Sequence, residues 1–385
     1  MKTRFLRYAV TVTAFAGLLG SALLTGAAPA AAAEKTPTSW ESAALGLSAA
    51  HRSSQGEGVT VAVLDTGIDE NHPALKGRVK DIGPDFYSKY DDLEPGDPNY
   101  GVHGTAMASD VLKVAPKADI IAARVTSDEV GDHDLPVRPK GKHPVAQGID
   151  YAVENGADVI SMSIGGNMFA EFSGAELAAV GRAVQAGVTI LASAGNSAEE
   201  GNEGNYPAGL APVISVAATQ QDGSRASFST VRTHNTIAAP GVGIISANLE
   251  GGYRPVQGTS PAGALASGVA ALMVAENPDL TPAQVRAILM RTAKHPPGGH
   301  NAFVGAGQIN AAAAVRAVGN PPKIDTAVKP YKGEEHFAKP TGTEKFRNAT
   351  MNTGQLAVGI GGAIVGLLCL LIGGFLLLRK KRSAA

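Results

Sequence analysis

Three polar side chains in this sequence are of the types that make up a nucleophilic catalytic site. Asp65 ends the apolar run VAVLD, His103 stands in GVHGT, and Ser260 stands in QGTSPAGALASG, just before an alanine-rich run. Taken singly, Asp65 is read as a turn former and His103 as a structural histidine. Ser260 is either a nucleophile or the residue that starts a helix, where free N–H groups and the helix dipole favour negative charge. The local sequence leaves both readings open.

The elements around these residues predict an α/β domain. Short runs rich in β-branched residues predict strands at 59–65, 118–125, 157–164, 187–194 and 211–218. Helical candidates separate or follow them at Pro144–Asn155, Gly174–Gln185, Thr259–Glu276 and Thr281–Thr292. Strands that alternate with helices favour a parallel sheet covered on both faces, in which loops at the carboxyl ends of the strands carry the functional side chains.

Charge and cysteine content bear on the partners of the protein and on the source of its stability. The chain has 33 Lys and Arg against 34 Asp and Glu, so it has no overall positive field and we expect no nucleic-acid partner. The single cysteine, Cys369, lies in an apolar run near the C-terminus, so the rest of the chain has no means of forming a disulfide. We therefore expect the stability of the main domain to come from packing.

Both ends of the chain resemble targeting segments. Residues 1–33 combine early basic residues, a short apolar run and the small-residue stretch AAPAAAA, which predicts a secretory signal peptide. Residues 356–378 form an apolar run of 23 residues without a charge, and as a helix it would be roughly 34 Å long, enough to cross a bilayer. The basic tail 379–385 follows at once, so we expect the C-terminus in the cytoplasm and the main domain outside it, on a cell membrane.

The order of the three residues in the chain is Asp, His, Ser, which is the order in subtilisin. The segments VLDTGIDENHPAL, HGTAMAS and GTSPAGALASGVAALM resemble the signature segments of the subtilisin-like serine peptidases, the subtilases. DVISMSIGG, LASAGN, NYPAG, RASFS and APG add to the likeness, which covers roughly residues 58 to 317. The resemblance implies a subtilisin-like three-layer α/β fold, with a mainly parallel sheet between layers of helices.

The same resemblance implies a mechanism and a set of site residues. Ser260 would attack a peptide carbonyl, His103 would move the proton, and Asp65 would fix the imidazole. Asn196 would supply a side-chain N–H to the oxyanion together with the backbone N–H of Ser260. An extended protein or peptide substrate would lie between two segments, Ser163, Ile164 and Gly165 on one side and Ser193, Ala194 and Gly195 on the other.

The sequence also departs from the subtilase pattern. Pro261 follows the candidate nucleophile, and a residue before proline is pushed from the α-helical region toward extended backbone, so we expect Ser260 to be rotated from its usual pose. Only ten residues, 104–113, separate His103 from Val114, where many subtilases hold calcium, so we predict no metal there and no cofactor. About 30 residues precede the first strand after residue 33, too few for a folded inhibitory prodomain.

The predicted organisation is therefore a series of segments, namely signal peptide 1–33, N-terminal extension 34–57, peptidase domain 58–317, Pro- and Lys-rich stalk 318–355, transmembrane helix 356–378 and basic tail 379–385. This layout resembles the mycosins, membrane-anchored subtilases associated with type VII secretion, which implies partners among secretion components. Mycosins often carry disulfides, and this chain does not.

Two functions remain, a membrane-anchored endopeptidase and a catalytically impaired subtilase-fold scaffold. A lipase-type hydrolase is disfavoured because Ser260 lacks a Gly-x-Ser-x-Gly motif.

Overall fold

The computed structural model describes residues 40–127, 143–165, 173–203, 206–249, 251–324 and 353–382. The chain divides into two compact units, Met1–Thr326 and Ala327–Ala385. The first unit holds the predicted peptidase domain, and the second holds one long helix. The signal peptide predicted at 1–33 lies outside the described residues, and so does most of the predicted stalk.

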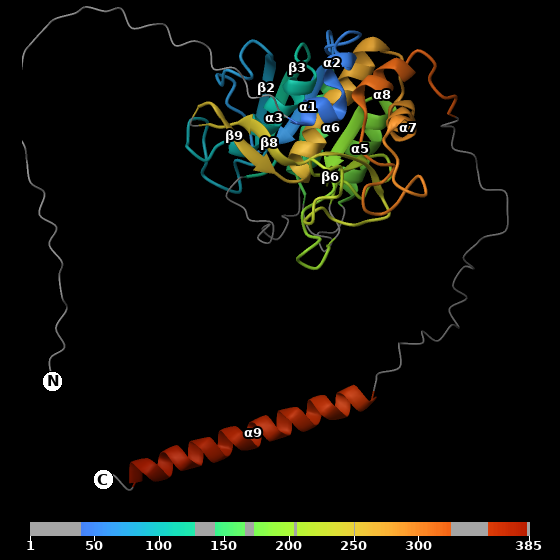
Figure 1. The fold of residues 1–385 in the computed structure, drawn as a ribbon. Coiled ribbons are helices and arrows are strands. Elements are labelled where there is room, and N and C mark those ends of the chain that lie inside the picture. Colours follow the sequence, from blue (N-terminus) through green and yellow to red (C-terminus); the bar gives the residue numbers. More distant parts are fainter. Residues whose placement is uncertain are drawn as a thin grey trace, which may run out of the picture. The chain divides into compact units, whose positions relative to one another are not determined.

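A parallel sheet of seven strands forms the centre of the first unit (Figure 1), with the strand order β2-β3-β1-β4-β5-β6-β7. The strands are β1 Thr60–Asp65, β2 Val79–Asp85, β3 Asp119–Arg124, β4 Val159–Met162, β5 Thr189–Ser193, β6 Ile214–Thr219 and β7 Asn235–Pro240. Five of them confirm the strands predicted from the apolar runs. The inner strands are buried on both faces, which is why they read as continuous apolar runs.

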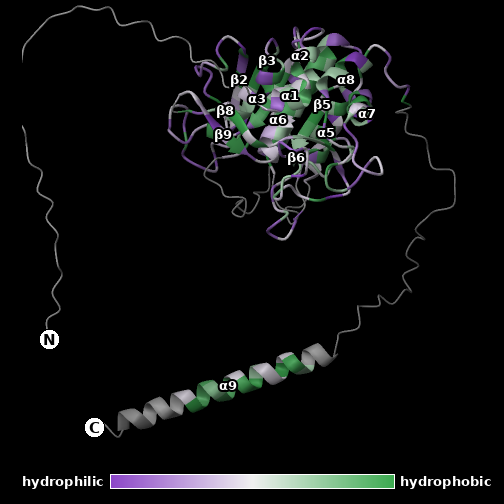
Figure 2. Cartoon of the chain, in the orientation of Figure 1, coloured by the Kyte–Doolittle hydropathy of each residue, from purple (hydrophilic) through white to green (hydrophobic). Residues whose placement is uncertain are grey.

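Helices cover both faces of this sheet, which confirms the predicted three-layer α/β fold. They are α3 Val102–Val114, α4 Pro144–Glu154, α5 Gly174–Gln185, α6 Thr259–Glu276, α7 Pro282–Thr292 and α8 Ala311–Ala317. One core cluster joins α3, α6, α7 and α8 to one face, and a second joins α4 and α5 to the other. In α6 nearly every side chain is buried, so this helix runs through the core, and Figure 2 shows the surrounding loops as more hydrophilic than the sheet.

A two-stranded antiparallel hairpin, β8 Val242–Ala247 and β9 Tyr253–Gln257, precedes α6 in the chain. The sequence analysis did not predict it, because β9 contains a proline and its side chains are mostly exposed, which gives no alternating apolar pattern. The N–H of Gly258 donates to the carbonyl oxygen of Gly241 at 2.8 Å, so the chain is held at the point where the hairpin passes into α6.

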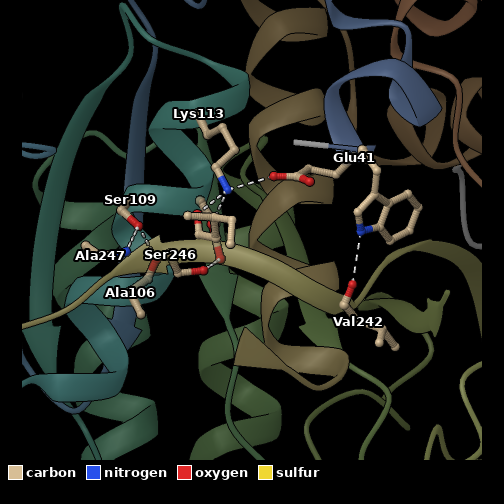
Figure 3. Close-up of polar contacts among 10 residues, drawn as sticks. Glu41, Ala106, Ser109, Lys113, Val242, Ser246 and Ala247 are labelled. Carbon is tan, nitrogen blue, oxygen red and sulfur yellow. Dashed lines mark hydrogen bonds and ion pairs between the residues drawn. The ribbon is translucent and has the colours of Figure 1, made fainter. Parts of the chain in front are cut away.

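Two short helices precede β1 in what was predicted as an N-terminal extension, α1 Trp40–Leu45 and α2 Leu47–Ala50. The indole Nε1–H of Trp40 donates to the carbonyl oxygen of Val242 at 3.0 Å. Glu41 is fully buried, and its carboxylate lies 2.9 Å from the ammonium group of Lys113 on α3 (Figure 3). The described part of the extension therefore belongs to the same packed unit as the sheet.

The second unit contains α9 Thr353–Arg382. This element confirms that the apolar run predicted as a transmembrane segment is helical. Side chains of α9 are described at 357–373, and Figure 2 shows this part as mainly hydrophobic. Within the described part of the chain, no helix was found to be long and apolar enough to span a membrane. The membrane anchor stays a prediction.

Candidate active site

The carboxyl end of β1 carries the first part of the site. Asp65 is 1% exposed, and its Oδ1 atom lies 2.7 Å from Nδ1 of His103 in the first turn of α3. Asp65 Oδ1 also accepts a hydrogen bond from the N–H of Thr66 at 2.8 Å. Because an ionised carboxylate only accepts hydrogen bonds, Nδ1 of His103 carries the hydrogen, and Nε2 is the basic nitrogen of the neutral ring. The structure thus brings together two residues that lie 38 positions apart in the sequence.

Two hydrogen bonds hold the segment after Asp65 against the segment after His103. The N–H of Gly104 donates to Oγ1 of Thr66 at 3.1 Å, and the N–H of Asp69 donates to Oγ1 of Thr105 at 2.8 Å. A Cβ atom on Gly104 would lie 2.0 Å from the carbonyl oxygen of Gly67, so only glycine permits this approach. The relative position of the carboxylate and the imidazole is therefore fixed by the backbone as well as by their own contact.

Ser260 lies in the first turn of α6 and is partly buried. Its hydroxyl donates to the carbonyl oxygen of Ser163 at 3.1 Å, and the Ser163 hydroxyl donates to the carbonyl oxygen of Ser260 at 2.8 Å. In the described part of the chain the Ser260 hydroxyl is thus paired with the end of β4 and makes no hydrogen bond to His103. Catalytic hydrogen bonds are often incomplete before substrate binds and form only in the complex.

Asn196 lies beside the start of α6. Its side-chain Oδ1 accepts from both the N–H and the hydroxyl of Thr259, at 2.9 and 3.0 Å. The amide nitrogen Nδ2 therefore lies on the side of Gly258, where a Cβ atom would come within 3.5 Å of it. An oxyanion donor is an N–H group of this kind near the nucleophile. The structure brings Asn196 to the predicted site, and its role stays a prediction.

The two segments predicted to hold substrate leave the neighbouring strands β4 and β5. Ser193 is the last residue of β5, and its hydroxyl donates to the carbonyl oxygen of Ile164 at 3.4 Å, so the segments 163–165 and 193–195 are in contact. The N–H of Gly195 donates to Oγ1 of Thr259 at 3.0 Å, which ties the second segment to α6. Ala194 is fully buried, whereas Gly165 is exposed. Substrate binding here stays a prediction.

The interval between His103 and Val114 is occupied by α3, which runs from Val102 to Val114 without a break. A helix therefore fills the interval for which the sequence analysis predicted no calcium loop. Within the described ranges, no group of three or more His, Cys, Asp or Glu side chains is placed to hold a metal ion.

A buried arginine next to the site was missed by the sequence analysis. Arg124 ends β3 and is the register partner of Asp65 on β1. Its guanidinium group pairs with Asp85 at 2.9 Å and with Asp91. The signal was present, because a charged residue at the end of the apolar run ADIIAARV requires a buried partner. The sequence does not say which acidic residues supply it.

The structure thus has a buried aspartate in contact with a histidine, and a serine in the first turn of a helix that packs on the helix of that histidine. The subtilase family model matches residues 56–307. This chain belongs to the subtilase family.

Relatives and solved structures agree with this assignment. Subtilisin NAT from Bacillus subtilis subsp. natto is 36% identical over 270 residues, which cover 68% of this chain and 66% of that protein, slightly less than two thirds of its length. The crystal structure of MycP1 from the ESX-1 type VII secretion system has a TM-score of 0.59 at 28% identity and covers 73% of this chain and 88% of the other. MycP1 from Mycobacterium smegmatis has a TM-score of 0.60 at 28% identity, with 78% and 91% covered.

Proposed function

We propose that this chain is a serine endopeptidase in which Asp65, His103 and Ser260 are the catalytic residues. The observation that carries the proposal is the 2.7 Å contact between Nδ1 of His103 and the buried carboxylate of Asp65. Helix α3, which carries His103, packs against α6, which carries Ser260. Membership of the subtilase family supports the same assignment.

In the proposed reaction the Oγ atom of Ser260 attacks the carbonyl carbon of a peptide bond while Nε2 of His103 takes the hydroxyl proton. The Asp65 carboxylate stabilises the imidazolium that forms. The oxyanion accepts hydrogen bonds from the side-chain amide of Asn196 and the backbone N–H of Ser260. His103 then gives the proton to the leaving amine, and water releases the acyl group by the same steps. For this to begin, the Ser260 hydroxyl must turn from the Ser163 carbonyl to His103.

The hydrogen bond from Ser260 to Ser163 also favours a second candidate function, a subtilase-fold scaffold with impaired catalysis. If the serine stays on the Ser163 carbonyl in solution, the domain would bind partners without cleaving them.

A labelling experiment separates the two candidates. The full chain is treated with a fluorophosphonate probe, with the variant Ser260→Ala as the control for attachment at this residue. The peptidase proposal expects labelling of the wild type that is lost in Ser260→Ala, together with hydrolysis of a peptide library. A folded wild-type protein that neither labels nor hydrolyses peptides would refute the peptidase and support the scaffold.

The apolar run at 356–378 and the basic residues after it support anchoring in a cell membrane, with the peptidase domain outside the cytoplasm. The likeness to MycP1 supports a role beside type VII secretion components. Deletion of residues 356–385 should move the protein from the membrane fraction to the soluble fraction. If the deleted and intact chains fractionate alike, the anchor is wrong.

A further inference from the structure

Among the described residues, Arg124 is the largest side chain that is fully buried, although it carries a permanent charge. The registers pair Val61 with Ile120 and Val63 with Ala122, and all four side chains belong to one core cluster. Because paired residues of neighbouring strands point to the same face of a sheet, Asp65 and Arg124 project to the face that α3 covers. The candidate site and the buried guanidinium group therefore lie on adjacent strands and on the same side.

The guanidinium group connects both ends of the segment 85–91. Its Nη1 atom lies 2.9 Å from the carboxylate of Asp85, and its Nη2 atom binds the carboxylate of Asp91. Burial opposes ionisation of Asp91, but hydrogen bonds from Arg124 and Ser127 lower the pKa of this carboxyl group. A planar fork with several N–H donors suits such a double contact, and a lysine ammonium group does not.

The guanidinium group also lies over two aromatic rings. Its Cζ atom lies 5.2 Å from the ring centroid of Tyr100 and 5.4 Å from that of Tyr87. The Tyr100 ring also meets the turn after Asp65, since a Cβ atom on Gly67 would lie 2.6 Å from Tyr100 Cε1. Tyr100 therefore contacts both Arg124 and the turn that follows the candidate catalytic aspartate.

The next residues lead directly to the histidine. Gly101 is the N-cap of α3 with φ at 72°, and a Cβ atom on it would lie 2.9 Å from the carbonyl carbon of Gly67. His103 is two residues further, in the first turn of the helix. A shift of Tyr100 would therefore displace the start of α3 and the imidazole relative to Asp65.

We propose that Arg124 is a positioning residue that acts through Tyr100 to hold His103 in register with Asp65. This inference rests on the proposed peptidase function. Arg124 does not touch the predicted substrate segments, because these leave β4 and β5 and β1 lies between them and β3. Its loss should therefore lower kcat and leave KM nearly unchanged.

The main test is Arg124→Met in the full chain, measured by peptide hydrolysis at a temperature where the variant is folded. Small displacements of catalytic groups lower rates strongly, so we expect a fall in kcat of about 10- to 100-fold with KM within about twofold. Arg124→Lys should also be slow, because an ammonium group keeps the charge but does not bridge both carboxylates. The matched control is Arg182→Met, which removes an exposed arginine that pairs with Asp150 and should leave kcat unchanged.

A second variant separates positioning from folding, since Arg124→Met leaves two carboxylates without their cation. The triple variant Asp85→Asn/Asp91→Asn/Arg124→Met removes those charges, so we expect its thermal stability to recover while kcat stays low. Tyr100→Ala should give the same loss of kcat. The inference is overturned if kcat recovers together with stability in the triple variant, or if Tyr100→Ala keeps wild-type kcat. If the wild type itself fails to hydrolyse peptides, the proposed function has failed instead.

Discussion

The buried cluster of Glu41, Asp110 and Lys113 allows a quantitative prediction (Figure 3). The Lys113 ammonium group lies 2.9 Å from Glu41 and 3.1 Å from Asp110, and both carboxylates are fully buried. Asp110 also accepts a hydrogen bond from the Ser246 hydroxyl at 2.7 Å. Burial raises the pKa of Asp110 from 3.8 to about 6, even though Lys113 and Ser246 act in the opposite direction. The cluster therefore joins α1, α3 and β8 around a carboxylate that already ionises reluctantly.

The perturbation is Lys113→Met, which keeps the length of the side chain and removes the only cation of this cluster. Removal of one partner from a buried ion pair costs about 3 to 5 kcal/mol, because the remaining charge is left uncompensated. Here two carboxylates lose their partner. In the wild type, the pKa of Asp110 is raised by roughly two units, so ionisation of this group already costs about 3 kcal/mol more in the folded protein than in the unfolded one. We therefore expect a loss of at least about 3 kcal/mol of unfolding free energy at pH 8.

The sign of the pH dependence follows from the same group. A carboxyl group whose folded pKa is above its unfolded value contributes stability that is present below the unfolded pKa and is lost as the pH rises through the folded pKa. Without Lys113 the folded pKa of Asp110 moves further up, so this loss grows. The deficit of Lys113→Met should thus be largest at pH 8 and shrink as the pH falls toward about 6, below which Asp110 is protonated in both folded proteins.

Urea unfolding of both proteins at several pH values measures the difference. Lys117→Met is the matched control, since Lys117 pairs with Glu57 at 2.8 Å but both side chains are about half exposed, and we expect it to cost no more than about 1 kcal/mol. Adding Glu41→Gln to Lys113→Met should restore part of the stability. A deficit below about 1 kcal/mol at pH 8, or one that is the same at pH 5, would refute the reasoning.

Two further predictions concern helix packing and capping. Gly268→Ala should cost about 1 to 3 kcal/mol in thermal unfolding, because the new Cβ atom would lie 2.6 Å from Cβ of Val114 where α6 packs on α3, and an unchanged melting temperature would contradict this. Thr281→Ala removes the N-cap of α7, whose side chain accepts from the N–H of Gln284, and should cost about 1 kcal/mol in urea unfolding, whereas Thr281→Ser should stay close to the wild type.

The five predicted strands and the four helices predicted in the peptidase domain agree with the structure, and the strands were readable because the central sheet is buried on both faces. The boundaries of α5 and α6 match the prediction, and α7 begins one residue later, at Pro282 after its N-cap. The sequence also indicated that Asp65 ends a strand, its resemblance to the subtilases implied that Asp65 fixes the imidazole of His103, and in the structure the two side chains are in contact. That contact depends on the close approach of Gly104 to Gly67, which no local pattern reveals.

The parts that were missed depend on partners far away in the chain. Helix α1 is only six residues long and has no strong periodic pattern, yet its Glu41 forms an ion pair with Lys113, which lies 72 residues later in the chain. Arg124 similarly pairs with acidic residues 33 and 39 positions earlier. A buried charge can be suspected from its place in an apolar run, but its partners are set by the topology of the sheet.

The effect of Pro261 shows how tertiary contacts override a local preference. The residue before a proline is disfavoured in helical conformation, yet α6 begins at Thr259 and includes Ser260. Thr259 explains this, because its N–H and hydroxyl both bind Asn196 and its Oγ1 accepts from the N–H of Gly195. These contacts fix the backbone one residue before the serine. Pro261 is the third residue of α6, where a backbone N–H has no intrahelical partner, so the N–H that proline lacks costs the helix no hydrogen bond. The backbone at Ser260 is thus already helical, and what must change before Ser260 can attack is its side-chain hydrogen bond to the carbonyl oxygen of Ser163.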